Sequence, residues 1–165
     1  MLKDLPVHTR QSLYRCLNVV REPWIEQEPE LTWAKYTCLD IRVNEQSLMC
    51  YVNGYEHSLF DMPCAVWNDG SIVWRRHGNA HRQSGGPDGI LLYPETRQVL
   101  VRRSWNRNVG VSIRGDIFIV LENDAVVHCN AINDVVKEIG GRISMNPYDR
   151  GVLTHLLQKL FNLSR

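Results

Sequence analysis

Two histidines recur at equivalent places of an internal repeat, and histidine is the side chain most suited to proton transfer or metal binding near neutral pH. His57 and His81 each lie three residues after a glycine and six residues before a proline. A two-histidine phosphoesterase needs Ser or Thr two residues after each histidine, where this chain has Leu59 and Gln83. We therefore expect the pair to meet the same structural need twice, with catalysis or ligation as the alternative.

Arginine is the other residue type that predicts chemistry. Between positions 75 and 107 the chain has seven arginines and two acidic residues, although its net charge is only +1. Strand alternation places Arg103, Trp105 and Arg107 on one face. Arginine beside exposed aromatic rings binds phosphate or carboxylate groups and stacks on bases. The alternative is a sheet with solubilising arginines outside and tryptophans in the core. The predicted binding residues are Trp74, Arg75, Arg76, Arg82, Arg97, Arg102, Arg103, Trp105 and Arg107.

Other catalytic motifs are absent from the sequence. It contains no G-x-S-x-G elbow and no G-x-x-x-x-G-K-[ST] phosphate loop. Backbone amides of the glycine-rich segment 84–89 could hold an anion, but its proline and aspartate are more typical of a turn between strands. Glu26, Glu28 and Glu30 alternate in a proline-bounded loop, as a solvated acidic surface does. We assign no catalytic residue, no metal site and no cofactor.

Composition indicates a single domain over residues 1–165. An apolar fraction of 44% with 22% charged residues is ordinary for a globular protein. No apolar run approaches the roughly 20 residues of a membrane span, and the N-terminus lacks the apolar block of a signal peptide. The five cysteines lack C-x-x-C or C-x-x-H spacing, which favours buried thiols over a zinc site. We expect a cytoplasmic protein with no membrane contact.

Hydrophobic periodicity predicts an α+β fold. Residues 6–21 read as a helix that begins at Pro6 and ends before Pro23. Residues 36–130 read as short strands separated by turn formers such as Asn53-Gly54, which indicates an antiparallel meander of hairpins. The expected strands are 36–43, 47–52, 55–59, 64–67, 71–76, 89–93, 97–105, 111–114, 117–121 and 125–129.

Two helices are predicted to close the chain, at residues 131–140 and 147–162. Asn130 is a candidate N-cap for the first helix, and Gly140-Gly141 ends it. The run Asn146-Pro147-Tyr148-Asp149 supplies the last helix with a cap, a first-turn proline and a first-turn acid. The apolar stripe of this helix is expected to pack on the sheet or on the preceding helix, with docking to a partner as the alternative.

The repeat itself has the frame G-x-x-H-x-x-x-x-x-P and extends from Asn53 to Arg103. Its second copy, Trp74-Arg75-Arg76-His77-Gly78-Asn79-Ala80-His81-Arg82-Gln83-Ser84-Gly85-Gly86-Pro87, resembles small phage and prophage proteins with His-Arg…Gly-Pro β-hairpin repeats. It is also loosely similar to variant MORN-type repeats. The first copy lacks the Arg after its His and the Gly before its Pro. The resemblance implies a hairpin-repeat scaffold in a viral or mobile-element setting and transfers no catalytic residue.

These observations predict a non-enzymatic binding protein whose Arg/Trp-rich sheet face contacts an acidic surface of a host or phage protein. The resemblance implies a phage-encoded modulator or inhibitor of a host defence protein, located in the host cytoplasm. One alternative is an enzyme or sequestering protein for a phosphorylated small molecule or nucleotide, with His57, His81 and the arginines around one pocket. The other alternative is direct nucleic-acid binding, which would be steeply salt-dependent.

Overall fold

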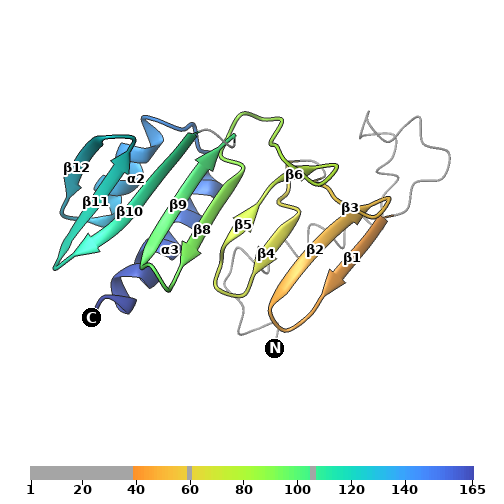
Figure 1. Ribbon diagram of the computed structural model, residues 1–165, viewed down its shortest axis with the longest axis horizontal. Helices are drawn as coiled ribbons and strands as arrows, with labels where there is room; N and C mark the ends of the chain where they lie inside the picture. The colour runs from red at the N-terminus through yellow and green to blue at the C-terminus, as the bar shows by residue number, and fades with distance from the viewer. Residues whose placement is uncertain (1–38, 59–60, 105–106) are drawn as a thin grey trace.

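The computed structural model describes residues 39–58, 61–104 and 107–165, and the predicted helix 6–21 lies outside them. The described chain is a mixed α+β structure, as predicted, in which a long antiparallel sheet is followed by two helices (Figure 1). Its elements are β1 (Leu39–Val43), β2 (Ser47–Val52), β3 (Tyr55–Glu56), β4 (Ala65–Trp67), β5 (Ile72–Val73), β6 (Arg75–Arg76), β7 (Asn79–Ala80), β8 (Gly89–Tyr93), β9 (Gln98–Arg103), β10 (Arg107–Arg114), β11 (Ile117–Glu122), β12 (Ala125–Cys129), α2 (Ile132–Gly140) and α3 (Pro147–Leu163).

The strands follow one another through the sheet in meander order, β1-β2-β4-β5-β8-β9-β10-β11-β12, with β3 beside β2. The small β6–β7 hairpin forms a second sheet. Every pairing is antiparallel, because the connections are tight turns rather than crossover helices.

The repeat in the sequence is also a repeat in the sheet. β2 pairs with β4 through Met49 and Ala65, and β5 pairs with β8 through Val73 and Gly89. The shift that carries His57 onto His81 also carries the first of these pairs onto the second. A backbone hydrogen bond also recurs at the same shift: Cys50 N donates to Cys64 O (2.7 Å) in the first unit, and Trp74 N donates to Asp88 O (2.8 Å) in the second.

The hairpin turns of the two units are equivalent, as predicted. Asn53 and Gly54 have φ values of 51° and 84°, and His77 and Gly78 have values of 48° and 81°. Two successive residues with positive φ make a type I′ turn, whose twist matches the right-handed twist of the strands. Pro63 and Pro87 each lie two residues before a strand begins, at β4 and β8. A proline there costs the ladder no amide donor.

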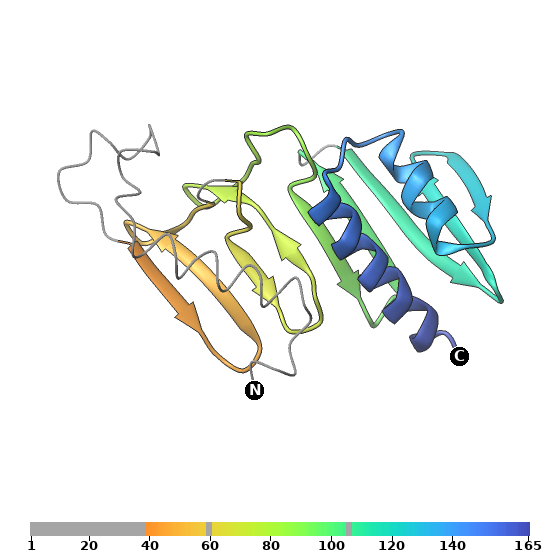
Figure 2. The same cartoon turned by 180° about the vertical axis from the view of Figure 1, so that it is seen from behind.

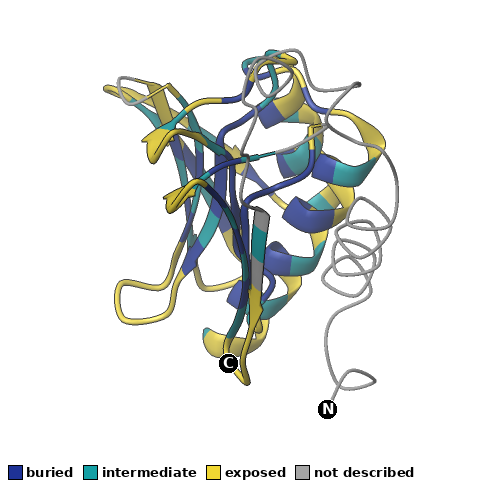
Figure 3. Ribbon diagram, turned by 90° about the vertical axis from the view of Figure 1, so that its right-hand side faces the viewer, coloured by how far each residue is buried: buried dark blue, intermediate teal, exposed yellow. Residues whose placement is uncertain are grey.

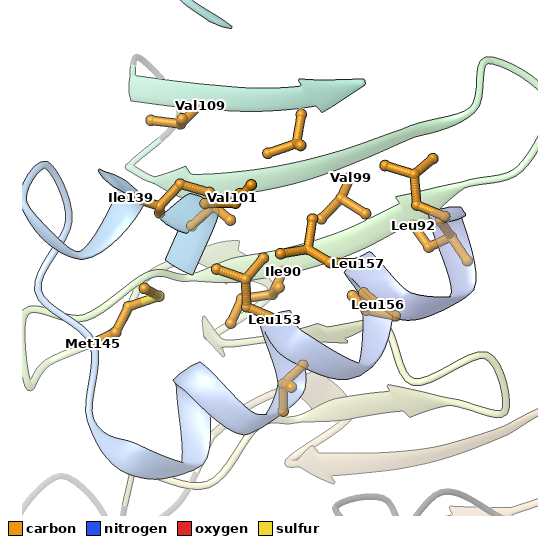
Figure 4. Close-up of a cluster of buried hydrophobic side chains, with 14 of the residues drawn as sticks. Ile90, Leu92, Val99, Val101, Val109, Ile139, Met145, Leu153, Leu156 and Leu157 are labelled. Carbon is orange, nitrogen blue, oxygen red and sulfur yellow. The ribbon is translucent and has the colours of Figure 1, made fainter. Parts of the chain in front are cut away.

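The core lies between one face of the sheet and the helices α2 and α3, which cover the back of β8 to β12 (Figure 2). Leu153, Leu156 and Leu157 of α3 point toward Ile90 and Val101 of the sheet (Figure 4). Alternate residues of the strands contribute to this layer, which is the period-2 pattern of a half-buried sheet. The stripe of the last helix is therefore core, as its spacing predicted.

The opposite side of the sheet, here called the open face, faces away from α2 and α3 (Figure 3). The pairing register places Met49, Ala65, Val73 and Leu91 on it. These side chains belong to a second, smaller apolar cluster with Cys64. Four further apolar side chains of this face are exposed: Tyr93, Ile117, Leu121 and Val126.

Several predicted boundaries differ from the structure. The predicted strand 71–76 is interrupted at Trp74, and the pairing of Asn79–Ala80 with Arg75–Arg76 was not predicted. Strand β10 begins at Arg107, ahead of the predicted start at 111. The helix predicted for 131–140 begins at Ile132, and its N-cap is Ala131 without a side-chain bond, so the assignment to Asn130 is wrong. The last helix has the predicted Asn146 cap, with a capping box to Asp149.

Leu156 is fully buried in the core, so its truncation tests the packing of α3. Leu156→Ala should lower the free energy of unfolding by about 2–5 kcal/mol, because it removes apolar contacts and leaves a cavity. Urea denaturation measures the change, and Leu163→Ala at an exposed position of the same helix is the control. A stability loss no larger than that of the control would contradict the assignment of α3 to the core.

His155 of α3 gives the protein a predictable dependence on pH. Burial lowers its pKa from 6.5, the positive charge of Lys159 lowers it further, and Asp69 opposes both. The unfolded chain therefore binds a proton more readily, so stability is lost as pH falls below about 6.5. Thermal melts from neutral to mildly acidic pH should show a smaller loss of stability for His155→Gln than for the wild type. Identical pH profiles would show that His155 does not contribute.

Candidate functional site

The two repeat units meet at a hollow of about 260 Å³, here called the cationic hollow. The loop after β3, the strand β6 and the segment after β7 contribute its walls. It is lined by His57, Ser58, Asp61, Trp74, Arg75, Arg76, His81, Arg82, Gln83 and Ser84. Both repeated histidines and three of the predicted arginines thus surround one cavity, as the pocket alternative from the sequence requires.

Hydrogen bonds between the two hairpins build the hollow. The amide of Gly78 donates to the carbonyl of Glu56 at 2.9 Å, and the amide of Ser58 donates to the carbonyl of Arg75 at 2.7 Å. The amide of His77 donates to Nδ1 of His57 at 3.2 Å. Because Nδ1 accepts a hydrogen bond, the ring proton of a neutral His57 is on Nε2.

The repeated histidines have different surroundings. His57 is buried and holds the turn of the second hairpin, whereas His81 is exposed at the rim of the hollow. The backbone role does repeat, since His57 N donates to Cys50 O and His81 N donates to Trp74 O in the same frame of the repeat. We expected both histidines to have the same structural role. Their backbone amides do have equivalent hydrogen bonds, but their imidazole rings have different surroundings.

Arg82 is the centre of the site. Its guanidinium stacks on the ring of Trp74 at 3.8 Å from the ring centroid. Nε and Nη2 donate to the two carboxylate oxygens of Asp61 at 2.8 and 2.9 Å, and Nη1 donates to the carbonyl of Pro87 at 3.1 Å. Nη1 also lies 3.0 Å from Oδ1 of Asp149, the capping acid of α3. Only 1% of the Arg82 side chain is exposed.

The charges of this buried cluster support one another. Burial lowers the pKa of Arg82, but the hydrogen bond to Asp61 and the charge of Asp149 outweigh it, so the net shift is upward and Arg82 stays charged. Burial raises the pKa of Asp149, and Arg82 opposes this effect. A buried cation between two carboxylates satisfies the general requirement that buried charges be paired.

Close packing around Arg82 accounts for a glycine of the loop. A Cβ at Gly86 would lie 2.6 Å from Nη1 of Arg82 and 3.3 Å from Oδ2 of Asp149. The glycine-rich segment 84–89 therefore gives room to the guanidinium rather than cradling an anion.

The remaining cations at the hollow are differently placed. Arg75 forms an ion pair with Glu56 and is partly exposed, whereas Arg76 is exposed on the β6–β7 hairpin. The hydroxyls are engaged by protein groups: Ser58 Oγ accepts from the amide of Arg75 at 3.1 Å, and Ser84 Oγ donates to Asp61 at 2.8 Å. Arg76 and His81 are both exposed among the residues that line the hollow.

The predicted Arg/Trp surface is divided in the structure rather than gathered on one face. Trp74 is fully buried, so this tryptophan follows the core alternative. Arg102, paired with Asp88 at 2.9 Å, lies on the open face beside Gly89. Arg103 follows it in the strand and lies on the other face, opposite Arg107 of β10.

Two further predicted residues are remote from the hollow, and one cannot be placed. Arg97 is exposed in the β8–β9 turn with φ of 53°. Arg107 lies 3.6 Å from Glu122. Trp105 is outside the described residues.

A second hollow of about 380 Å³ is here called the sheet groove, and Arg75 lines both hollows. Only two residue pairs join β5 to β8, so the strands diverge beyond them (Figure 1). The groove is lined by Trp67, Asp69, Ser71, Val73, Arg75, Leu91, Leu92, Tyr93 and Arg102. Of its lining residues, Arg75 and Arg102 are among the predicted binding residues, whereas Trp67 is not.

Sequence reasoning missed Asp61 and Asp149, the two acids that hold Arg82. A signal for Asp61 was present, since it corresponds to Gly85 in the second copy of the repeat. Both residues have positive φ, 60° for Asp61 and 90° for Gly85. An aspartate at a place where the repeat uses glycine is strained, and its contacts with Arg82 and Ser84 offset that strain. Asp149 was recognised only as a helix cap.

The described residues contain no cluster of three or more metal-ligating side chains. Among the same residues, no helix is long and apolar enough to cross a membrane. Cys50, Cys64 and Cys129 are buried, as predicted, and burial raises the pKa of the Cys129 thiol. Comparison with known proteins found no matching family model, no similar curated protein and no similar solved structure.

Removing Arg82 should destabilise the whole fold. Arg82→Ala leaves Asp149 buried without its cation and uncovers Trp74, which should cost about 3–5 kcal/mol of unfolding free energy. Arg114→Ala, an exposed arginine in the β10–β11 hairpin, should change stability by less than about 0.5 kcal/mol. Guanidinium denaturation followed by tryptophan fluorescence measures both. A small loss for Arg82→Ala would show that the cluster is not structural.

Proposed function

We propose that this protein is a non-enzymatic binding protein that takes an acidic side chain of a protein partner into the cationic hollow. The observation that carries the proposal is the convergence of His57, His81, Arg75, Arg76 and Arg82 on one cavity. Arg82 shapes the floor of the hollow, and the exposed Arg76 and His81 are accessible at its rim. Arginine is the preferred residue for carboxylate recognition because its planar guanidinium presents several donors.

The sheet groove favours a protein partner over a free small molecule. Arg75 lines both cavities, and the groove offers the side chains of Trp67, Leu91 and Tyr93 to apolar groups of a partner. A segment with an acidic residue next to an apolar or aromatic one would fill both cavities. Aromatic residues at the centre of a contact carry most of the binding free energy in protein interfaces.

Nucleic acid fits less well, because affinity for a phosphate backbone depends on many unneutralised cations. Here Arg75, Arg82, Arg102 and Arg107 each lie against a carboxylate of the same chain. Asp61, which accepts the hydrogen bond from the Ser84 hydroxyl, already accepts two hydrogen bonds from Arg82, which favours binding over a nucleophilic reaction at Ser84.

The biological setting of the proposal comes from the resemblance. The two hairpin units, with their matching strand pairs, support a hairpin-repeat scaffold of the kind that the resemblance implies. On this basis we propose a phage-encoded modulator that acts on a host or phage protein in the host cytoplasm. Inhibition of a host defence protein is the form of this role that the resemblance suggests.

Nuclear magnetic resonance titration tests the proposal with three probes: a peptide alternating glutamate with phenylalanine, inorganic pyrophosphate, and a single-stranded oligonucleotide. We expect the peptide to perturb the backbone amides of His57, Arg76 and His81 and of residues lining the sheet groove. Arg76→Glu should weaken peptide binding by about tenfold, which is roughly 1.4 kcal/mol. Arg114→Glu, the same charge reversal on a remote hairpin, should bind like the wild type.

The three probes separate the alternatives. Tight binding of pyrophosphate alone would favour a protein that sequesters phosphorylated molecules, and salt-sensitive binding of the oligonucleotide would favour a nucleic-acid protein. Charge reversal at Arg103 and Arg107 tests the prediction from the sequence that these two arginines contact the partner. No effect of Arg76→Glu on any probe would exclude the hollow as the binding site.

A further inference from the structure

Strand β12 forms one end of the sheet, and no described strand pairs with its outer edge. It pairs with β11 in an uninterrupted register from Phe118 and Cys129 to Glu122 and Ala125, without a bulge. Its sequence Ala-Val-Val-His-Cys contains no lysine, proline or acidic residue. Natural proteins blunt free edges with such features because an open edge recruits another strand. An unprotected edge of this kind indicates a strand partner.

The hairpin geometry identifies the backbone groups at this edge. Asn123 and Asp124 form a two-residue loop, so Ala125 and Val127 exchange their hydrogen bonds with β11. The amides and carbonyls of Val126 and His128 therefore point outward. The β2–β3 hairpin obeys the same rule, since the carbonyl of Glu56 points outward and accepts from the amide of Gly78.

We infer that β12 pairs with β12 of a second copy of this chain, around a two-fold axis at Val127, and joins the two sheets into one. In this register Val126 of each copy lies opposite His128 of the other. All four outward groups of each strand are then bonded, which gives four interchain hydrogen bonds. A two-fold antiparallel pair is self-complementary by construction, as a symmetric dimer interface must be.

The side chains beside the edge are also suited to a second copy. On the open face, Val126 is 52% exposed. Pairing would place its side chain beside that of His128 of the second copy and cover part of it.

On the other face, a hollow of about 480 Å³ between β12 and α2 carries both signs of charge. Its charged residues are Asp134, Lys137, Glu138 and Arg142. Glu138 and Arg142 form an ion pair within α2 at 2.8 Å, and Asp134 and Lys137 add one charge of each sign, so this surface suits a copy of itself better than a partner of one charge. Because α2 packs on β11 and β12, the two-fold would bring the two α2 helices to about two strand spacings, or roughly 10 Å, a normal helix packing distance.

Sedimentation equilibrium from low-micromolar to millimolar concentration tests the dimer. We expect the mass to rise from 19.1 kDa to twice that value. Amide hydrogen exchange adds a specific readout: the amides of Val126 and His128 should become protected as concentration rises, whereas the amide of Val127, which bonds within the chain, should be protected throughout. A monomer at every concentration, with Val126 and His128 exchanging rapidly, overturns the inference.

Substitutions at the edge locate the contact. Val126→Lys should raise the dimer dissociation constant by about tenfold or more, because a lysine on an edge strand opposes pairing with a second strand. His128→Pro removes an outward amide while the pairing with β11 keeps its donors, so the dimer should weaken with the melting temperature nearly unchanged. Val43→Lys, the same change at an exposed valine of β1, is the control. A dimer that withstands both edge substitutions, or weakens equally with the control, overturns the inference, as does an edge that captures added extended peptides but no second copy.

Discussion

The ion-pair cluster around Arg82 is the constraint on which the rest of this structure depends. One guanidinium joins the loop of the first repeat unit at Asp61, the loop of the second unit at Pro87 and the first turn of α3 at Asp149. It also covers Trp74, a side chain of the main core. Because the cation is shared by all three segments and its loss would leave Asp149 buried without a partner of opposite charge, the three segments are held in one arrangement.

The two repeat units share one backbone arrangement, but their side chains have different roles. Both units have a type I′ turn, the same strand register and equivalent backbone hydrogen bonds between their strands. Their side chains then diverge: Asp61 in the first unit supplies a carboxylate to Arg82 at the place where the second unit has Gly85. His57 is buried beneath the next turn, whereas His81 remains at the surface. The differences between the two units, rather than the features that they share, form the cationic hollow.

Local chemistry made much of the fold predictable. Asn53-Gly54 determines its turn through positive φ, and Asn146-Pro147 begins α3 through a capping box. The break at Trp74 and the short β6–β7 hairpin were not predictable in this way, because they depend on Trp74 entering the core beneath Arg82. Predicting Asp149 as a partner of Arg82 would have required knowing that the last helix contacts a loop far earlier in the chain.

Ion pairs between residues far apart in the sequence also explain why the number of arginines did not predict the charge of the surface. Seven arginines against two acids in residues 75–107 suggested an unbalanced positive surface. The neutralising carboxylates come mostly from outside that segment, from Glu56, Asp61, Glu122 and Asp149. Much of the local excess of arginine is therefore neutralised by carboxylates of the same chain. For the partner that we propose, selectivity at the cationic hollow and the sheet groove should therefore depend more on shape than on net charge.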